Sequence, residues 1–270
     1  MPAGIDRKNP EREGLPPGYR MRADAHYVDQ LTSRRMEKPV TDAPRAAEKP
    51  AEASVRIDEL LAHLSEGLTT IESVATLLSN DTSPIARRVN LDLIKTQAWR
   101  ASWSLRAHAI LQGIHRPLVR PRPLGFLLGQ IRTGFAAECR LSGVGLQVHT
   151  SDWNAVVAVD ESSLIAGLAA AVFSTLGLVE QAEGVTINVN AVASAGELRT
   201  VDITQDDVMV PTGTGAGFFD SPGADRSAMW PARLAASTAK AVARQHGGDA
   251  SFLVTDRGGS TIRLHFSRAR

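Results

Sequence analysis

Cysteine, net charge and long apolar runs are all scarce in this sequence. The 270 residues include a single cysteine, Cys139, so no intramolecular disulfide can form, and its apolar neighbours are typical of a small core residue in a reducing compartment. The formal net charge is +1, from 30 basic and 29 acidic residues, without a dense basic block. Because nucleic-acid binding depends on a concentrated basic patch, the sequence argues against a nucleic-acid partner.

Membrane and metal signals are also lacking. No stretch approaches the roughly 18 apolar residues that span a bilayer, and the N-terminus has no apolar segment of a signal peptide. We therefore expect a cytoplasmic protein with no membrane span. The seven histidines show no metal-ligand spacing with the cysteine or with carboxylates, and neither a Gly-x-Ser-x-Gly nor a His-Glu-x-x-His sequence occurs. The sequence thus predicts no metal site and supports neither nucleophilic nor zinc catalysis.

The N-terminal segment is rich in proline. Seven of the fourteen prolines fall within the first 50 residues among alternating charges, and such a composition buries too little apolar surface to offset the entropy lost on ordering. We expect residues 1–53 to form a largely disordered tail. Residues 15–31 differ, because they hold both tyrosines and a run of apolar anchors. They form either a short motif that folds on a partner or on the protein's own domain, or a chance cluster.

Apolar residues at three- and four-residue intervals predict two long helices. From Val55 to Leu78 they form one stripe, with Ser54 as the expected N-cap. Ser83-Pro84 begins a second helix with a near-heptad rhythm, whose Trp99 and Trp103 pack within the hairpin or face the following domain. Residues 54–116 should therefore form an antiparallel hairpin. Two helices leave part of each stripe uncovered, so pairing into a four-helix bundle, and hence a homodimer, is expected.

The periodicity changes after a proline-containing break at residues 116–123. Residues 123–270 begin with a helix from Leu124 to Phe135. Later patterns predict strands at 146–149, 155–159, 185–190, 198–203, 250–255 and 260–266, helices at 162–178 and 232–246, and a glycine-rich loop over 205–228. These elements predict an α+β sandwich, with helices on one face of a mixed sheet.

Three segments resemble the sensor histidine kinase family. The helix that ends in His246-Gly247-Gly248, with the strand, glycine turn and threonine-bearing strand after it, resembles the end of the family's GHKL, or Bergerat-type, ATPase domain. Residues 160–178 resemble the helix that carries the N-box, and the hairpin over 55–113 resembles the dimerisation and phosphotransfer hairpin. The segments occur in the family's order and span most of the chain. The resemblance implies a Bergerat-like fold and two-component signalling.

The residues that hold ATP in this family are replaced. The N-box supplies two asparagines, one of which binds Mg²⁺ through a hard oxygen ligand, and these positions align with Ala170 and Ser174. The first glycine box, which binds adenine, aligns with Gln205, Asp207 and Met209, and this acidic segment should repel phosphate and obstruct the pocket.

The second glycine box should lie at the start of the helix that ends in His246, where backbone N–H groups cradle phosphate. Its glycine positions align with Pro231, Arg233 and Ala235. Proline removes a donor, and the side chains block close approach. The resemblance therefore implies a degenerate pocket, and we expect neither ATP nor Mg²⁺ as a cofactor unless the chain is an atypical active kinase.

The phosphotransfer site is altered too. The family's phosphorylated histidine aligns with Ala62, and His63 follows, where the family has an acidic general base. His63 borders the apolar stripe, and Glu66, three residues later, lies on the same side of the helix. A solvated helix residue is the leading interpretation of His63, and a phosphoacceptor accompanied by Glu66 is the alternative.

We therefore predict a catalytically degenerate pseudokinase that acts by binding proteins. Its expected partners are a second copy of the chain and either a response regulator receiver domain or a true histidine kinase. Two enzymatic alternatives stay open: a phosphotransferase that relays phosphate through His63, and an active ATP-dependent kinase. The phosphotransferase requires His63 to project to solvent. The active kinase requires open space between residues 164–178 and 205–235, where side chains could otherwise fill the pocket.

Overall fold

The computed structural model describes residues 49–80, 83–179, 182, 184–211, 214–215, 217–219 and 230–267. The expected tail up to residue 48, with its motif at 15–31, lies outside these residues. The first helix, α2 (Lys49–Asn80), begins upstream of Ser54. The prediction of Ser54 as N-cap, and of a tail that reaches residue 53, is therefore wrong. Ala51, Glu52 and Ala53 are strong helix formers, which explains the earlier start.

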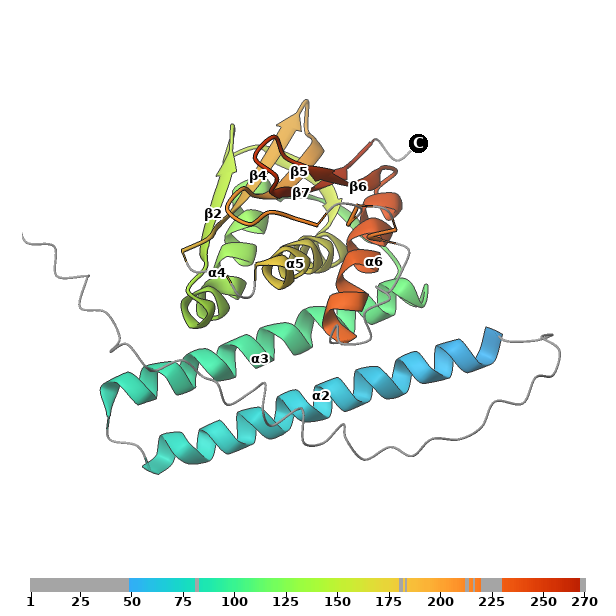
Figure 1. The fold of residues 1–270 in the computed structure, drawn as a ribbon. Coiled ribbons are helices and arrows are strands. Elements are labelled where there is room, and N and C mark those ends of the chain that lie inside the picture. Colours follow the sequence, from blue (N-terminus) through green and yellow to red (C-terminus); the bar gives the residue numbers. More distant parts are fainter. Residues whose placement is uncertain are drawn as a thin grey trace, which may run out of the picture. The chain divides into compact units, whose positions relative to one another are not determined.

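The second helix, α3 (Pro84–Leu111), runs back along α2 (Figure 1). Its start agrees with the sequence, because the Ser83 hydroxyl accepts a hydrogen bond from the backbone N–H of Ala86 at 3.5 Å. Leu60, Gly67 and Val74, seven residues apart, form a buried stripe along α2. A Cβ at Gly67 would lie 3.5 Å from Oε1 of Gln97 on α3, which is an ordinary van der Waals contact.

The remaining chain forms an α+β sandwich, as the sequence predicts. Five strands make one mixed sheet, in the order β2 (Gly145–Thr150), β4 (Thr186–Ser194), β5 (Glu197–Gln205), β7 (Ser260–His265) and β6 (Asp249–Val254). β2 and β4 are parallel, and the other neighbours are antiparallel. Helices α4 (Leu124–Ser142), α5 (Glu161–Leu178) and α6 (Trp230–Gln245) cover one face of this sheet (Figure 1).

Two further strands, β1 (Val119–Pro123) and β3 (Val156–Asp160), form a separate antiparallel ribbon. The break predicted at residues 116–123 is therefore wrong for β1. Its prolines are tolerated because a two-stranded ribbon leaves one edge of each strand without ladder hydrogen bonds. Val119 pairs with Asp160, so the chain that leaves the hairpin lies beside the start of α5.

Helix α5 is the centre of the sandwich. Residues 163–176 are all buried, between the sheet on one side and α3 and α6 on the other. Contrary to the sequence-based expectation, this helix is long and apolar enough to cross a membrane by length and composition, yet 78% of it is buried inside the structure. Burial on all sides explains why it lacks a polar face.

The hairpin and the sandwich share one hydrophobic core. Trp103 and Ala107 of α3 are fully buried in the same cluster as residues of α4 and α5. The Trp99 ring meets Phe135 edge-on, with centroids 5.9 Å apart, and Trp103 lies 5.4 Å from Phe173. Both tryptophans therefore face the following domain, which is one of the two placements that the sequence left open; the other was packing within the hairpin.

Candidate functional site

The N-box positions lie on the buried helix α5. Ala170 is fully buried, and Ser174 is nearly so. The Ser174 hydroxyl has no hydrogen-bond partner among the described residues. α5 and α6 are in direct contact nearby, because a Cβ at Gly167 would lie only 2.7 Å from Val242. Neither N-box position therefore presents the amide oxygen that the sequence resemblance implies as a Mg²⁺ ligand.

Gln205, at the end of β5, is fully buried, and the protein itself uses both ends of its amide. Nε2 donates to the carbonyl of Val208 at 2.8 Å and to the hydroxyl of Ser260 at 3.2 Å. Oε1 accepts from the Val208 N–H at 2.8 Å. Gln205 would have to break these bonds to contact a base.

The neighbours of Gln205 lie on the surface. An Asp207 carboxylate oxygen accepts from the Thr186 N–H at 2.9 Å, and Met209 is 79% exposed. Of the three positions that align with the first glycine box, only Gln205 occupies interior space.

Aromatic rings fix part of the loop before α6. Phe219 is buried, its carbonyl accepts from Ser237 at 3.3 Å, and the Lys240 ammonium lies 5.9 Å from its ring centroid. Phe218 stacks on Phe252 of β6, with centroids 4.4 Å apart. This segment belongs to the glycine-rich loop that the sequence predicts over 205–228. Ala235 of α6 is fully buried, whereas the side chains of Pro231 and Arg233 lie outside the described part.

His63 is half-buried on α2, so the expectation of a solvated residue is met only in part. Burial lowers the pKa of His63, and the positive charge of Arg100 on α3 lowers it further. Because the pKa falls below its usual value near 6.5, the imidazole is neutral at pH 7 and keeps a nitrogen lone pair. Arg100 also donates to Glu138 at 2.7 Å. Glu66 is exposed.

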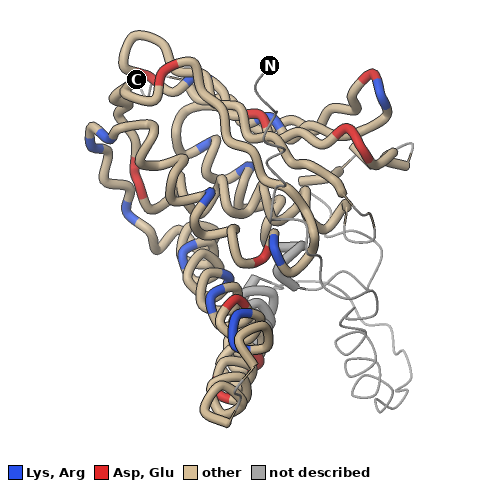
Figure 2. Tube along the Cα trace, turned by 90° about the vertical axis from the view of Figure 1, so that its left-hand side faces the viewer, with Lys and Arg blue, Asp and Glu red and all other residues tan. Residues whose placement is uncertain are grey.

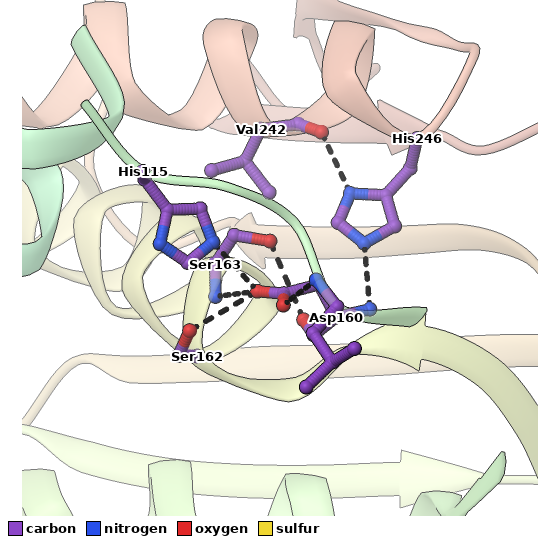
Figure 3. A network of polar contacts seen from close by, with 7 residues as sticks. His115, Asp160, Ser162, Ser163, Val242 and His246 are labelled. Carbon is purple, nitrogen blue, oxygen red and sulfur yellow. Dashed lines mark hydrogen bonds and ion pairs between the residues drawn. The ribbon is translucent and has the colours of Figure 1, made fainter. Parts of the chain in front are cut away.

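A polar network at the start of α5 was not predicted (Figure 3). Asp160 caps the helix, since Oδ1 accepts from the N–H of Ser163 at 2.7 Å and Oδ2 accepts from the N–H of Leu118 at 2.6 Å. His115 Nε2 lies 3.0 Å from Oδ1, and the Ser162 hydroxyl lies 3.1 Å from it. Burial raises the pKa of Asp160, but these hydrogen bonds outweigh burial and lower it to about 2.

His246 approaches the same point from α6. Its Nδ1 lies 2.9 Å from the Val242 carbonyl, and its Nε2 lies 3.3 Å from the Asp160 nitrogen (Figure 3). A carbonyl only accepts, so Nδ1 carries the proton and Nε2 accepts the Asp160 N–H. Burial lowers the pKa of His246, and the bond to Val242 offsets this in part. The histidine of the His-Gly-Gly signature thus ties the end of α6 to the start of α5.

A cavity of about 290 Å³ adjoins this network. It is formed where the end of α3, the residues before β1, β1 itself and the start of α5 meet, and it is lined by Arg106, His115, Arg116, Leu118, Arg120, Arg122, Gln130, Asp160, Glu161 and Ser162. The sequence contained one signal for it: Arg120 and Arg122 alternate with prolines, which places both on one side of a strand. Basic and acidic positions are otherwise interspersed along the described chain (Figure 2).

No cluster of three or more histidine, cysteine or carboxylate side chains that could hold a metal occurs within the described ranges.

Comparisons with known proteins found similar chains among solved structures. No family model and no curated protein matches the chain. Among solved structures, the histidine kinase AdeS of Acinetobacter baumannii is 8% identical, with 77% of this chain and 98% of AdeS covered and a TM-score of 0.48. The chain is similar to histidine kinases. A Burkholderia phymatum histidine kinase is 17% identical, with 83% and 100% covered and a TM-score of 0.42. A bacterial phosphotransferase is 13% identical, with 82% and 99% covered and a TM-score of 0.47.

Proposed function

We propose that this chain is a dimeric pseudokinase, which serves two-component signalling by binding proteins and does not transfer phosphate from ATP. The observation that carries the proposal is Gln205. It fills interior space where the sequence resemblance expects an adenine-binding aspartate, and Val208 and Ser260 occupy its amide. Ala170 and Ser174 lack the amide oxygen that the resemblance implies as the Mg²⁺ ligand.

An uncovered apolar stripe on the hairpin supports the dimer. On α2, Leu61 and Leu68 are seven residues apart, and Leu68 is 64% exposed. On α3, Leu91 and Leu105 are fourteen residues apart, and Leu105 is 51% exposed. Heptad spacing on two antiparallel helices suits a four-helix bundle, and a second copy presents the same stripes.

The expected partners follow from the sequence resemblance. A receiver domain of a response regulator would dock on the hairpin, or a true histidine kinase would form a mixed bundle with it. Both encounters take place in the cytoplasm, which is therefore where we expect this chain to act.

Calorimetric titration of Mg²⁺-ATP into the full chain tests the loss of nucleotide binding. We expect ATP to bind no more tightly than its phosphates alone, because the base has no free polar group to contact. Sodium tripolyphosphate is the control, since it carries the phosphates without adenine. Micromolar binding of ATP that tripolyphosphate does not share would overturn the pseudokinase proposal.

Sedimentation of the full chain and of two α2 variants tests the dimer. Leu68→Glu places a charge in the exposed stripe and should convert a dimer into a folded monomer, because the charge would be buried only in the bundle. Ser73→Glu adds the same charge on the opposite side of α2 and should leave the dimer intact. A wild-type monomer at 100 μM or so, well above the dissociation constant of an ordinary obligate dimer, would refute the proposed bundle.

The lowered pKa of His63 favours phosphorelay as a second function. A neutral imidazole beside the Arg100 cation has the lone pair that attacks an aspartyl phosphate. Incubation with a ³²P-labelled receiver domain tests it: label should pass to the wild type and not to His63→Gln. His108→Gln, on α3, is the matched control and should still accept label. If receivers that bind the chain transferred no label, phosphorelay would be ruled out and only the protein-binding function would remain.

A further inference from the structure

The cavity beside Asp160 combines four arginines with two carboxylates. Arg106 comes from α3, Arg116 from the segment before β1, and Arg120 and Arg122 from β1. Asp160 and Glu161 come from the end of β3 and the start of α5. Side chains from the hairpin and from the sandwich therefore meet in one small space.

Both carboxylates are already engaged by the protein. Asp160 accepts from Leu118, Ser163 and Ser162 and contacts His115. Glu161 lies 2.6 Å from Arg122 and accepts from Gln130 at 3.3 Å. Their charge is thus directed at these partners, and Asp160 also occupies the cap position of α5.

Three positive charges stay unmatched. Arg106, Arg116 and Arg120 are exposed, and none has an ion-pair or hydrogen-bond partner among the residues that the structure describes. Single exposed arginines are ordinarily solvated and unremarkable. Here three of them, from separate segments, line the same cavity, and like charges held together repel one another unless an anion is present.

We propose that this cavity binds a small anion that carries two or more neighbouring phosphate groups. A guanidinium forms a planar fork that pairs with two phosphate oxygens, so several arginines suit several phosphates. A volume of about 290 Å³ matches the lower end of small-molecule sites and is too small for a folded partner or a nucleic-acid duplex. Anion binding does not depend on the proposed function, because the cavity lies at the start of α5 and the N-box positions lie further along it; only the link to protein binding rests on that function.

Binding at this site would join the hairpin to the sandwich. Arg106 belongs to α3, which carries the exposed stripe, and Arg120 belongs to β1. An anion held between them stabilises their contact, because a ligand that binds only the folded state raises its stability. The site thus links the concentration of a phosphorylated small molecule to the rigidity of the surface proposed for protein binding.

Titration of sodium tripolyphosphate into the full chain at fixed ionic strength tests the proposal. The double variant R106Q/R120Q should weaken binding at least about tenfold, since it removes two of the guanidinium groups that would pair with the phosphates. The control R87Q/R132Q removes the same charge from exposed arginines of α3 and α4 outside the cavity, and it should bind as the wild type does. Orthophosphate should bind at least about tenfold more weakly than tripolyphosphate, because it engages fewer arginines.

Three results would overturn the site: no tripolyphosphate binding at millimolar concentration, equal losses in R106Q/R120Q and R87Q/R132Q, or orthophosphate binding as tight as that of tripolyphosphate. ATP identifies the source of the phosphates. ATP that matches tripolyphosphate and fails with R106Q/R120Q supports this cavity and leaves the pseudokinase proposal intact. ATP that binds tightly in R106Q/R120Q argues against the pseudokinase proposal instead.

Discussion

Arg140 of α4 binds Asp92 of α3 through two hydrogen bonds, from Nε to Oδ2 at 2.8 Å and from Nη2 to Oδ1 at 2.7 Å. A second ion pair joins the same two helices with the charges exchanged: the arginine lies on α3 and the carboxylate on α4, where Arg100 donates to Glu138 at 2.7 Å. Sliding one helix along the other would bring like charges together. The two pairs therefore fix the register between the hairpin and the sandwich.

Arg140→Ala should destabilise the protein by about 2 kcal/mol, because it leaves Asp92, only 5% exposed, without its partner. The hydrogen bond from Arg140 lowers the pKa of Asp92, so this pKa should rise in the variant. Urea unfolding at pH 7 measures the first effect. Arg132→Ala, an exposed position on the same helix, should change stability by less than about 0.5 kcal/mol. Equal effects of the two substitutions would show that the ion pair contributes nothing.

Trp99 lies flat against the backbone of α4 at Gly134. A Cβ at this position would lie 2.4 Å from Trp99 Cε2, so Gly134→Ala forces the ring or the helix to move. We expect a loss of about 1–3 kcal/mol, as for other overpacked cores. Gly129→Ala on the same helix meets nothing within 4 Å and should gain up to about 1 kcal/mol from helix propensity. Thermal unfolding that ranks both variants alike would contradict this packing.

Local patterns predicted the elements better than the contacts between them. The heptad spacing and Ser83-Pro84 predicted the two hairpin helices, and alternation predicted the mixed sheet. The sequence did not predict β1, because its prolines indicate a break and because its partner strand, β3, lies more than 30 residues later. Periodicity identified an apolar face around Trp103 but not the domain that covers it.

The candidate sites show the same limit. The alignment predicted that Gln205 does not suit adenine, but its bond to Ser260 joins residues 55 positions apart. His115 and Asp160 are 45 positions apart, and Asp160 and His246 are 86 apart. No local pattern links such residues, so neither the network nor the adjoining cavity was predictable from spacing.

Cys139 should be almost unreactive while the protein is folded. Burial, and to a smaller extent the charge of Glu138, raise the pKa of its thiol to about 11. Since the thiolate is the nucleophile, a rise from 9.0 to about 11 lowers its fraction at pH 8 about a hundredfold. Alkylation by iodoacetamide should therefore be at least about a hundredfold slower in buffer than in 8 M urea, a concentration chosen to unfold the chain. Comparable rates in the two solvents would disprove burial of the thiol.

Acid should weaken the fold in two steps. Burial lowers the pKa of His246 below its usual 6.5, so the unfolded chain binds a proton that the folded chain excludes. The contribution of His246 is complete above pH 6.5 and falls as the pH drops through that value toward the folded pKa. The pKa of Asp160 is about 2 instead of 3.8, so its contribution, about 2 kcal/mol, is complete above pH 3.8 and is lost toward pH 2.

The first step can be assigned with one substitution. His115 and Asp160 are the titratable groups that face His246, and protonation of its Nε2 would set two donors against each other at the Asp160 N–H. Wild type should lose more unfolding free energy between pH 7.5 and 5.5 than His246→Gln, which has no proton to gain. His149→Gln, an exposed histidine of β2, should keep the wild-type slope. If His246→Gln also kept that slope, another group would be responsible, and the neutral Nδ1–H tautomer would lose its support.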